Sequence, residues 1–102
     1  MNNAEILIID DEPEICVMLS EILSNQGHQT SVFNGGIDGI EALKKDDYDI
    51  LITDLGMPDL SGWDVISVAR QTNPSVLIGM ITGWNVSDEE AKQKGVDFLI
   101  NK

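Results

Sequence analysis

The amino-acid sequence predicts an α/β fold in which five parallel strands form a doubly wound sheet with helices on both faces. Three observations predict it: short runs of isoleucine, leucine and valine recur along the chain, amphipathic segments separate them, and the connections between them are short. A parallel strand that is buried on both faces is a continuous apolar run rather than an alternating one. The strand order expected for such a sheet is 2-1-3-4-5, which places the first and third strands side by side.

The strands are predicted from four strong apolar runs and one weaker run. The strong runs are Ile6–Ile9, Ile50–Ile52, Val76–Ile81 and Val96–Ile100. The weaker run, Gln29–Phe33, supplies the second strand in chain order. The strong runs have the short length and the isoleucine- and valine-rich composition of strands that are buried on both faces.

Four helices are expected between these strands. The first begins at Pro13, since proline suits the first helical turn, and ends before Gly27. The second and third are predicted from apolar residues at helical spacing, namely Ile37, Ile40 and Leu43, and then Val65, Ile66 and Ala69. The fourth begins at Ser87, which has the capping-box spacing to Glu90, and ends at Gly95.

Composition and charge exclude several classes of protein. The chain has 102 residues, which we expect to form one domain, residues 1–102. Eighteen acidic and six basic residues give a formal net charge of −12, so we expect no direct nucleic acid binding by this chain. No apolar run approaches the roughly 18 residues of a membrane-spanning helix. The single cysteine, Cys16, excludes an internal disulfide framework, and we expect a cytoplasmic location.

Polar side chains follow the strands at the point where each strand ends. Asp10 and Asp11 follow the first strand, Asp54 the third, Thr82 the fourth and Lys102 the fifth. An isolated aspartate at such a place is commonly a turn or cap residue. Because the carboxyl ends of parallel strands meet at one edge of the sheet, however, all five side chains are expected to lie together there.

This predicted cluster suits magnesium and phosphoryl chemistry. Three neighbouring carboxylates repel one another, and a hard divalent cation such as Mg²⁺ removes the repulsion. A lysine and a threonine beside the same site supply a cation and a hydroxyl for a phosphoryl group. An aspartate can itself accept that group as an aspartyl phosphate.

Four segments together resemble the receiver domain of two-component response regulators. They are ILIIDDEPE, LITDLGMPDLSGWDVI, IGMITGW and GVDFLINK, and the likeness runs from about Glu5 to Lys102. The resemblance implies the flavodoxin-like version of the sheet described above. It also implies a phosphorylation-dependent switch that is not a turnover enzyme, and that accepts a phosphoryl group from a sensor histidine kinase or a phosphotransfer protein.

The resemblance also assigns roles to individual residues. Asp54 corresponds to the phosphoacceptor, Asp11 to the direct Mg²⁺ ligand and Asp10 to its partner through water. The backbone carbonyl of Gly56 completes the protein ligands. Thr82 corresponds to the switch hydroxyl and Lys102 to the lysine that pairs with the phosphoryl group.

Two features of the sequence differ from the family. The family usually has an aromatic residue three positions before the lysine; here that position is Leu99, and Phe98 is expected to point to the opposite face of the sheet. The family also continues past the lysine into a fifth helix, which is absent from the given chain. We therefore expect the runs Ile6–Ile9 and Val96–Ile100 to be partly uncovered, with self-association as one outcome.

Two alternative functions stay open at this stage. One is a pseudo-receiver, an interaction module that keeps the fold but signals without phosphorylation; the intact acidic cluster argues against it. The other is a small phosphotransferase like those of the haloacid dehalogenase superfamily. Those enzymes have a second aspartate two residues after the nucleophile, and Gly56 occupies that position here. An output domain beyond residue 102 would be a further partner.

Overall fold

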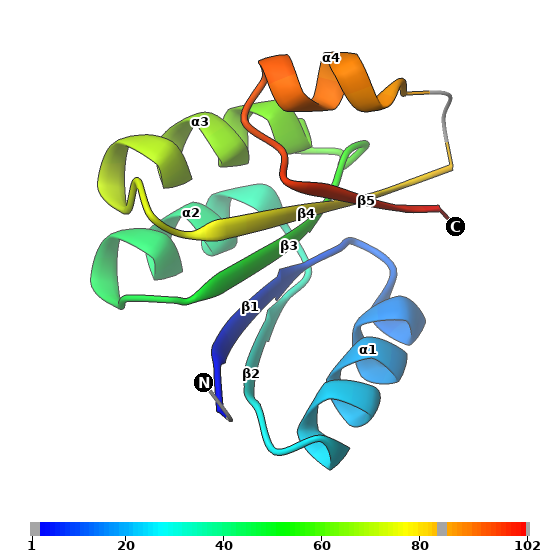
Figure 1. Ribbon diagram of the computed structural model, residues 1–102. Helices are drawn as coiled ribbons and strands as arrows, with labels where there is room; N and C mark the ends of the chain where they lie inside the picture. The colour runs from blue at the N-terminus through cyan, green and yellow to red at the C-terminus, as the bar shows by residue number, and fades with distance from the viewer. Residues whose placement is uncertain (1–2, 84–85, 102) are drawn as a thin grey trace.

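The computed structural model of the protein describes residues 3–83 and 86–101 (Figure 1). Its strands are β1 (Glu5–Ile9), β2 (Gln29–Phe33), β3 (Ile50–Asp54), β4 (Leu77–Thr82) and β5 (Phe98–Asn101). Its helices are α1 (Pro13–Asn25), α2 (Gly36–Lys45), α3 (Gly62–Thr72) and α4 (Asp88–Gln93). Strands and helices alternate along the chain, as the sequence predicts.

The five strands form one parallel sheet in the order β2-β1-β3-β4-β5. This order confirms the predicted fold class. Residues Ile9 of β1 and Thr53 of β3 are register partners, as are Asp54 of β3 and Ile81 of β4. The carboxyl ends of β1, β3 and β4 therefore meet at one edge of the sheet.

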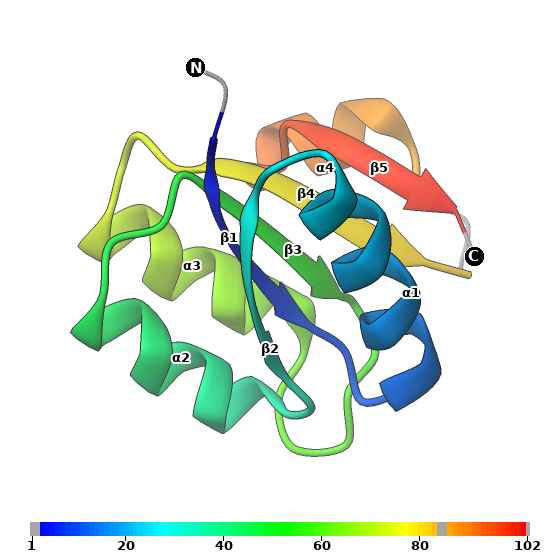
Figure 2. The same cartoon turned by 90° about the horizontal axis from the view of Figure 1, so that it is seen from below.

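Helices cover the two faces of the sheet unequally (Figure 2). One face carries α2, α3 and α4, whose buried residues pack in the larger core with Leu7, Leu51 and Ile78 of the sheet. The other face carries α1, and its smaller core includes Ile8 and Ile52. The sheet is thus a layer between two hydrophobic cores, which is the architecture of a doubly wound fold.

The predicted exposure of the first strand is wrong. Residues Ile6–Ile9 are at most 1% exposed, because β1 lies between β2 and β3 and is covered by helices on both faces. The fifth strand differs, since Phe98, Leu99 and Ile100 are only half-buried. Self-association through this region stays a prediction.

The start of β5 and the capping contacts of α4 differ from the sequence prediction for identifiable reasons. Strand β5 begins at Phe98 rather than Val96, because the chain turns at Gly95 with a φ of 94° and the Asp97 side chain binds the backbone of Ile78. At α4, the Ser87 hydroxyl accepts from the Glu90 amide as predicted. The Glu90 carboxylate lies 3.6 Å from the Lys94 ammonium, however, and the complete capping box in the described residues belongs to α3. Among the described residues, no helix is long and apolar enough to cross a membrane.

Candidate functional site

Four acidic side chains converge at the carboxyl edge of the sheet. Asp10, Asp11, Glu12 and Asp54 each offer one carboxylate oxygen, and these oxygens lie within 4.8 Å of one another. Asp10 and Asp54 are buried, Asp11 is half-buried and Glu12 is exposed. The structure thus brings together the three aspartates that the sequence predicts to be neighbours.

Strand register explains why Asp10 and Asp54 are neighbours. Ile9 pairs with Thr53, so the residue after each lies at the end of two adjacent strands. The backbone carbonyl of Asp10 accepts hydrogen bonds from Asn34 Nδ2 at 3.0 Å and from Cys16 Sγ at 3.4 Å. The Asp10 carboxylate accepts from the Glu12 amide at 2.9 Å. These contacts fix the direction in which the chain leaves β1.

The loop that follows Asp54 closes on itself. The Leu55 amide donates to the Ile81 carbonyl at 3.1 Å, and the Gly62 amide donates to the Leu55 carbonyl at 2.7 Å. Gly56 forms an isolated bridge with Ser61. A Cβ at Gly62 would lie 2.3 Å from the Asp54 carbonyl oxygen, so glycine is required for this close approach. These contacts hold the loop that contains Gly56 close to the end of β3, where Asp54 lies.

Thr82 ends the strand adjacent to β3 and is 2% exposed. It pairs in register with Asn101, the residue before Lys102. Lys102 itself lies outside the described residues, as does Trp84, which follows the exposed Gly83. The structure thus places four of the predicted strand-end residues at one edge and leaves the lysine untested.

Two residues of the site are absent from the sequence-based prediction. Glu12 belongs to the carboxylate cluster, and its place directly after the acidic pair is the signal that could have indicated it. Asn34 follows β2 and binds the Asp10 carbonyl, a contact that depends on the position of an edge strand. A local pattern could not have indicated that contact.

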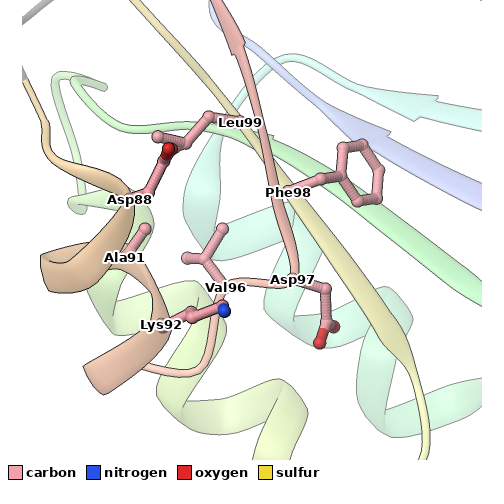
Figure 3. A pocket seen from close by; sticks show the side chains of 7 residues that line it. All are labelled: Asp88, Ala91, Lys92, Val96, Asp97, Phe98 and Leu99. Atoms are coloured by element: carbon pink, nitrogen blue, oxygen red, sulfur yellow. The ribbon is translucent and has the colours of Figure 1, made fainter.

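The side chains of β5 confirm the prediction for Phe98 and Leu99. Leu99 packs against the core that α2, α3 and α4 cover, and Phe98 packs against the core of α1. Figure 3 shows Leu99 extending toward Asp88 and Ala91 of α4, while Phe98 points to the other side of the strand. Leu99 lines a cavity of about 170 Å³ between α4 and β5. Leu99, three positions before Lys102, thus faces α4, and Phe98 faces α1, as the sequence predicts.

The donor set fits a hard divalent cation. Carboxylate oxygens are ligands that Mg²⁺ prefers, and the half-buried Asp11 and the exposed Glu12 leave room for the several waters that this cation retains. Beside the cluster, burial and then the Asp10 carboxylate raise the pKa of the Cys16 thiol. Cys16 is therefore a buried residue of the smaller core whose thiol resists ionisation.

Comparison with known proteins defines the class of this fold and site. A sequence profile of the response regulator receiver domain matches residues 6–102. The chain belongs to the response regulator receiver domain family.

Individual relatives agree with this membership. The transcriptional regulatory protein PcoR of Escherichia coli is 37% identical over 94 residues, which are 91% of this chain and 40% of PcoR. The sensor histidine kinase RcsC of Escherichia coli is 27% identical over 99 residues, 95% of this chain and 10% of RcsC. The chain thus spans less than half the length of these curated relatives.

Solved structures share the fold over nearly the whole chain. The response regulator TrrA of Thermotoga maritima, solved in complex with Mg²⁺ and BeF, superposes with a TM-score of 0.86 at 26% identity and covers 96% of this chain and 85% of that one. A response regulator receiver domain protein of Clostridium thermocellum has a TM-score of 0.87 at 27% identity, covering 97% and 82%.

Proposed function

We propose that this chain is a phosphorylation-dependent signalling switch in which Asp54 accepts a phosphoryl group from a sensor histidine kinase or a phosphotransfer protein. The observation that carries the proposal is the convergence of Asp54 with Asp10, Asp11 and Glu12. Receiver domains are signalling switches rather than turnover enzymes, and we assign this chain the same role.

The same cluster supports a Mg²⁺ site. Asp11 and Asp54 would be direct ligands, Asp10 would act through water, and the Gly56 carbonyl would complete the set. TrrA, a relative of the same fold, was solved with Mg²⁺ and BeF. When bound, the cation neutralises charge on the carboxylates and on the phosphoryl oxygens.

Phosphoryl transfer to Asp54 forms one bond to phosphorus and breaks another. A carboxylate oxygen of Asp54 forms a bond to phosphorus while the phosphorus–nitrogen bond of a phosphohistidine breaks. The departing imidazole nitrogen keeps the electron pair and takes a proton from water. Hydrolysis of the resulting acyl phosphate returns the carboxylate and releases inorganic phosphate. The Thr82 hydroxyl would donate a hydrogen bond to a phosphoryl oxygen, and the Lys102 ammonium would pair with the negative charge of the phosphoryl group.

The relatives indicate which partners to expect. PcoR is a transcriptional regulatory protein and RcsC is a sensor histidine kinase, and this chain covers only part of each. We therefore propose a histidine kinase as donor, an output domain beyond residue 102, and a cytoplasmic location. The charge of −12 supports the expectation that nucleic acid binding, where it occurs, belongs to such an output domain.

Intact-mass analysis after incubation with acetyl phosphate and Mg²⁺ tests the proposal. We expect one added phosphoryl group on the wild type, none on Asp54→Asn, and normal uptake by Asp49→Asn, whose side chain lies at the other end of β3. Uptake by Asp54→Asn would contradict the acceptor assignment. A wild type that takes up no phosphoryl group from acetyl phosphate or from a kinase would favour the pseudo-receiver instead.

A further inference from the structure

The Asp59 carboxylate joins the loop after β3 to the beginning of α2. Its oxygens accept from the Gly36 amide at 3.1 Å and from the Ile37 amide at 3.0 Å, and also from the Leu60 amide at 2.9 Å. The residue before α2, Gly35, has no side chain to cap the helix. Asp59 therefore satisfies amides that helix α2 would otherwise leave to water.

The glycines at the start of α2 permit this approach. A Cβ at Gly36 would lie 2.9 Å from the Leu60 Cβ, and one at Gly35 would lie 3.2 Å from an Asp59 oxygen. Because the Leu60 Cβ is attached directly to the backbone, it can move away only if the loop moves too. Helix α2 and the loop are thus joined by the hydrogen bonds of the Asp59 carboxylate and by the close packing of Leu60 against Gly36.

Helix α2 also packs closely on the strand that leads to the acidic pair. A Cβ at Gly39 would lie 2.2 Å from Ile9 Cδ1, and Ile9 immediately precedes Asp10. One end of α2 contacts the loop that contains Gly56, and its next turn contacts the end of β1. The helix therefore connects the two chain segments that carry the proposed Mg²⁺ ligands.

Other contacts of the loop involve the residues nearest to β3 and α3. Leu55, Gly56, Ser61 and Gly62 are joined to one another or to β4. Between them, Met57 is buried in the larger core. The Asp59 carboxylate adds hydrogen bonds from the Gly36 and Ile37 amides, which join this loop to α2.

We propose that Asp59 is a positioning residue for the Mg²⁺ site: by binding the start of α2 it fixes the loop that presents the Gly56 carbonyl beside Asp54. This inference rests on the proposed function, because it assigns Gly56 to the ligand set. It adds a residue that contacts neither the cation nor the phosphoryl group.

Mg²⁺ titrations of matched variants test this role, with intrinsic tryptophan fluorescence as the readout and unfolding by urea as a measure of stability. Asp59→Ala should weaken Mg²⁺ affinity about tenfold, the lower end for residues that orient metal ligands. Asp59→Asn, which keeps one oxygen acceptor, should lose less affinity. Gly36→Ala should weaken binding in the same direction, because it displaces Leu60.

Asp49→Ala is the matched control. Its carboxylate also accepts from a backbone amide, that of Glu5 at 2.8 Å, but it does so at the amino end of β3. Its Mg²⁺ affinity should equal that of the wild type. Amide hydrogen exchange adds a readout without metal: in Asp59→Ala, the amides of Gly36, Ile37 and Gly62 should all exchange faster.

The outcomes separate this inference from the function on which it rests. If Asp54→Asn binds Mg²⁺ with the same affinity as the wild type, the proposed function is refuted, and so is the role of Asp59. Binding that depends on Asp54 but is equal in Asp59→Ala and Asp49→Ala would refute the role of Asp59 alone. Faster exchange at Gly36 and Ile37 without a change at Gly62 would likewise reduce Asp59 to a helix cap.

Discussion

The aromatic ring of Phe98 lies directly over Gly79, its register partner on the adjacent strand β4. A Cβ at Gly79 would fall 2.2 Å from the ring carbon Cε2, so no larger residue fits without moving the ring. Phe98 thereby packs on the α1 face of the sheet, and Leu99 is left to face α4. The glycine on β4 and the order of the two β5 residues are parts of the same packing arrangement.

We expect Gly79→Ala to lower the free energy of unfolding by about 1–3 kcal/mol, the usual cost of overpacking a core. The half-buried Phe98 ring must tilt away and lose contacts. Urea unfolding measures the effect. In combination with Phe98→Leu, the alanine should cost much less, because the smaller side chain leaves room for the Cβ. Additive costs in the double variant would contradict the contact.

Magnesium affinity should respond differently to the two aspartates that follow β1. Asp11→Ala is expected to weaken Mg²⁺ binding more than Asp10→Ala, because the first is the proposed direct ligand and the second acts through water. Removing either carboxylate also relieves repulsion, so apo stability can rise while affinity falls. Tryptophan fluorescence titrations measure the order, and equal losses would contradict the assigned roles.

Lys102→Ala should separate cation binding from phosphoryl chemistry. The lysine side chain is proposed to pair with the phosphoryl group rather than with Mg²⁺, so Mg²⁺ affinity should stay close to that of wild type. Uptake from acetyl phosphate, or the spectral change that follows it, should be impaired. Stopped-flow fluorescence with and without acetyl phosphate compares the two. Unchanged kinetics together with an unchanged spectral shift would mean that the lysine has no role in the site.

The fold and the carboxyl-edge cluster could be predicted because each depends on local patterns. Apolar runs such as Ile6–Ile9 mark strands whose burial is two-sided, and the strand order then brings Asp10 beside Asp54. The opposite directions of Phe98 and Leu99 follow from strand alternation alone.

What could not be predicted depends on contacts between distant segments. Asp59 lies 22 residues from Ile37, and only the packed fold shows that it caps α2. Ile6–Ile9 are buried because α1 and α2 cover the two faces of this central strand, an arrangement that the local sequence pattern of the strand does not contain. Strand β5 begins at Phe98, later than predicted, because the Asp97 side chain binds Ile78 and Arg70, which are remote in sequence.

Acid pH should remove the stabilising effect of the Asp59 carboxylate. The bonds from Ile37 and then Gly36 hold the pKa of Asp59 below its ordinary value of 3.8. A carboxyl group whose pKa is lower in the folded state than in the unfolded state stabilises the fold at pH values above its unfolded-state pKa. This contribution is lost as the pH falls through the folded-state pKa. Stability of Asp59→Asn should therefore fall less steeply than that of wild type below the ordinary pKa. Parallel pH profiles from urea unfolding would contradict this effect.

Arg70 joins the end of α3 to the starts of β4 and β5. Its guanidinium donates to the Gly95 carbonyl at 2.7 and 3.2 Å and to the Val76 carbonyl at 2.7 Å, and it pairs with Asp97 at 2.8 Å. The planar fork of donors suits these several acceptors, which a single ammonium cannot reach together.

We expect Arg70→Ala to lower the free energy of unfolding by about 2 kcal/mol, because partly buried carbonyls lose their donors. Arg70→Lys should recover less than half of that loss, since lysine restores the charge but not the fork. Urea unfolding measures both. Mg²⁺ affinity should be unchanged in either variant, because these contacts lie at the amino ends of β4 and β5, away from Asp54. A lysine variant as stable as wild type would show that charge alone accounts for the effect, and a loss of Mg²⁺ affinity would show that the two ends of the sheet are coupled.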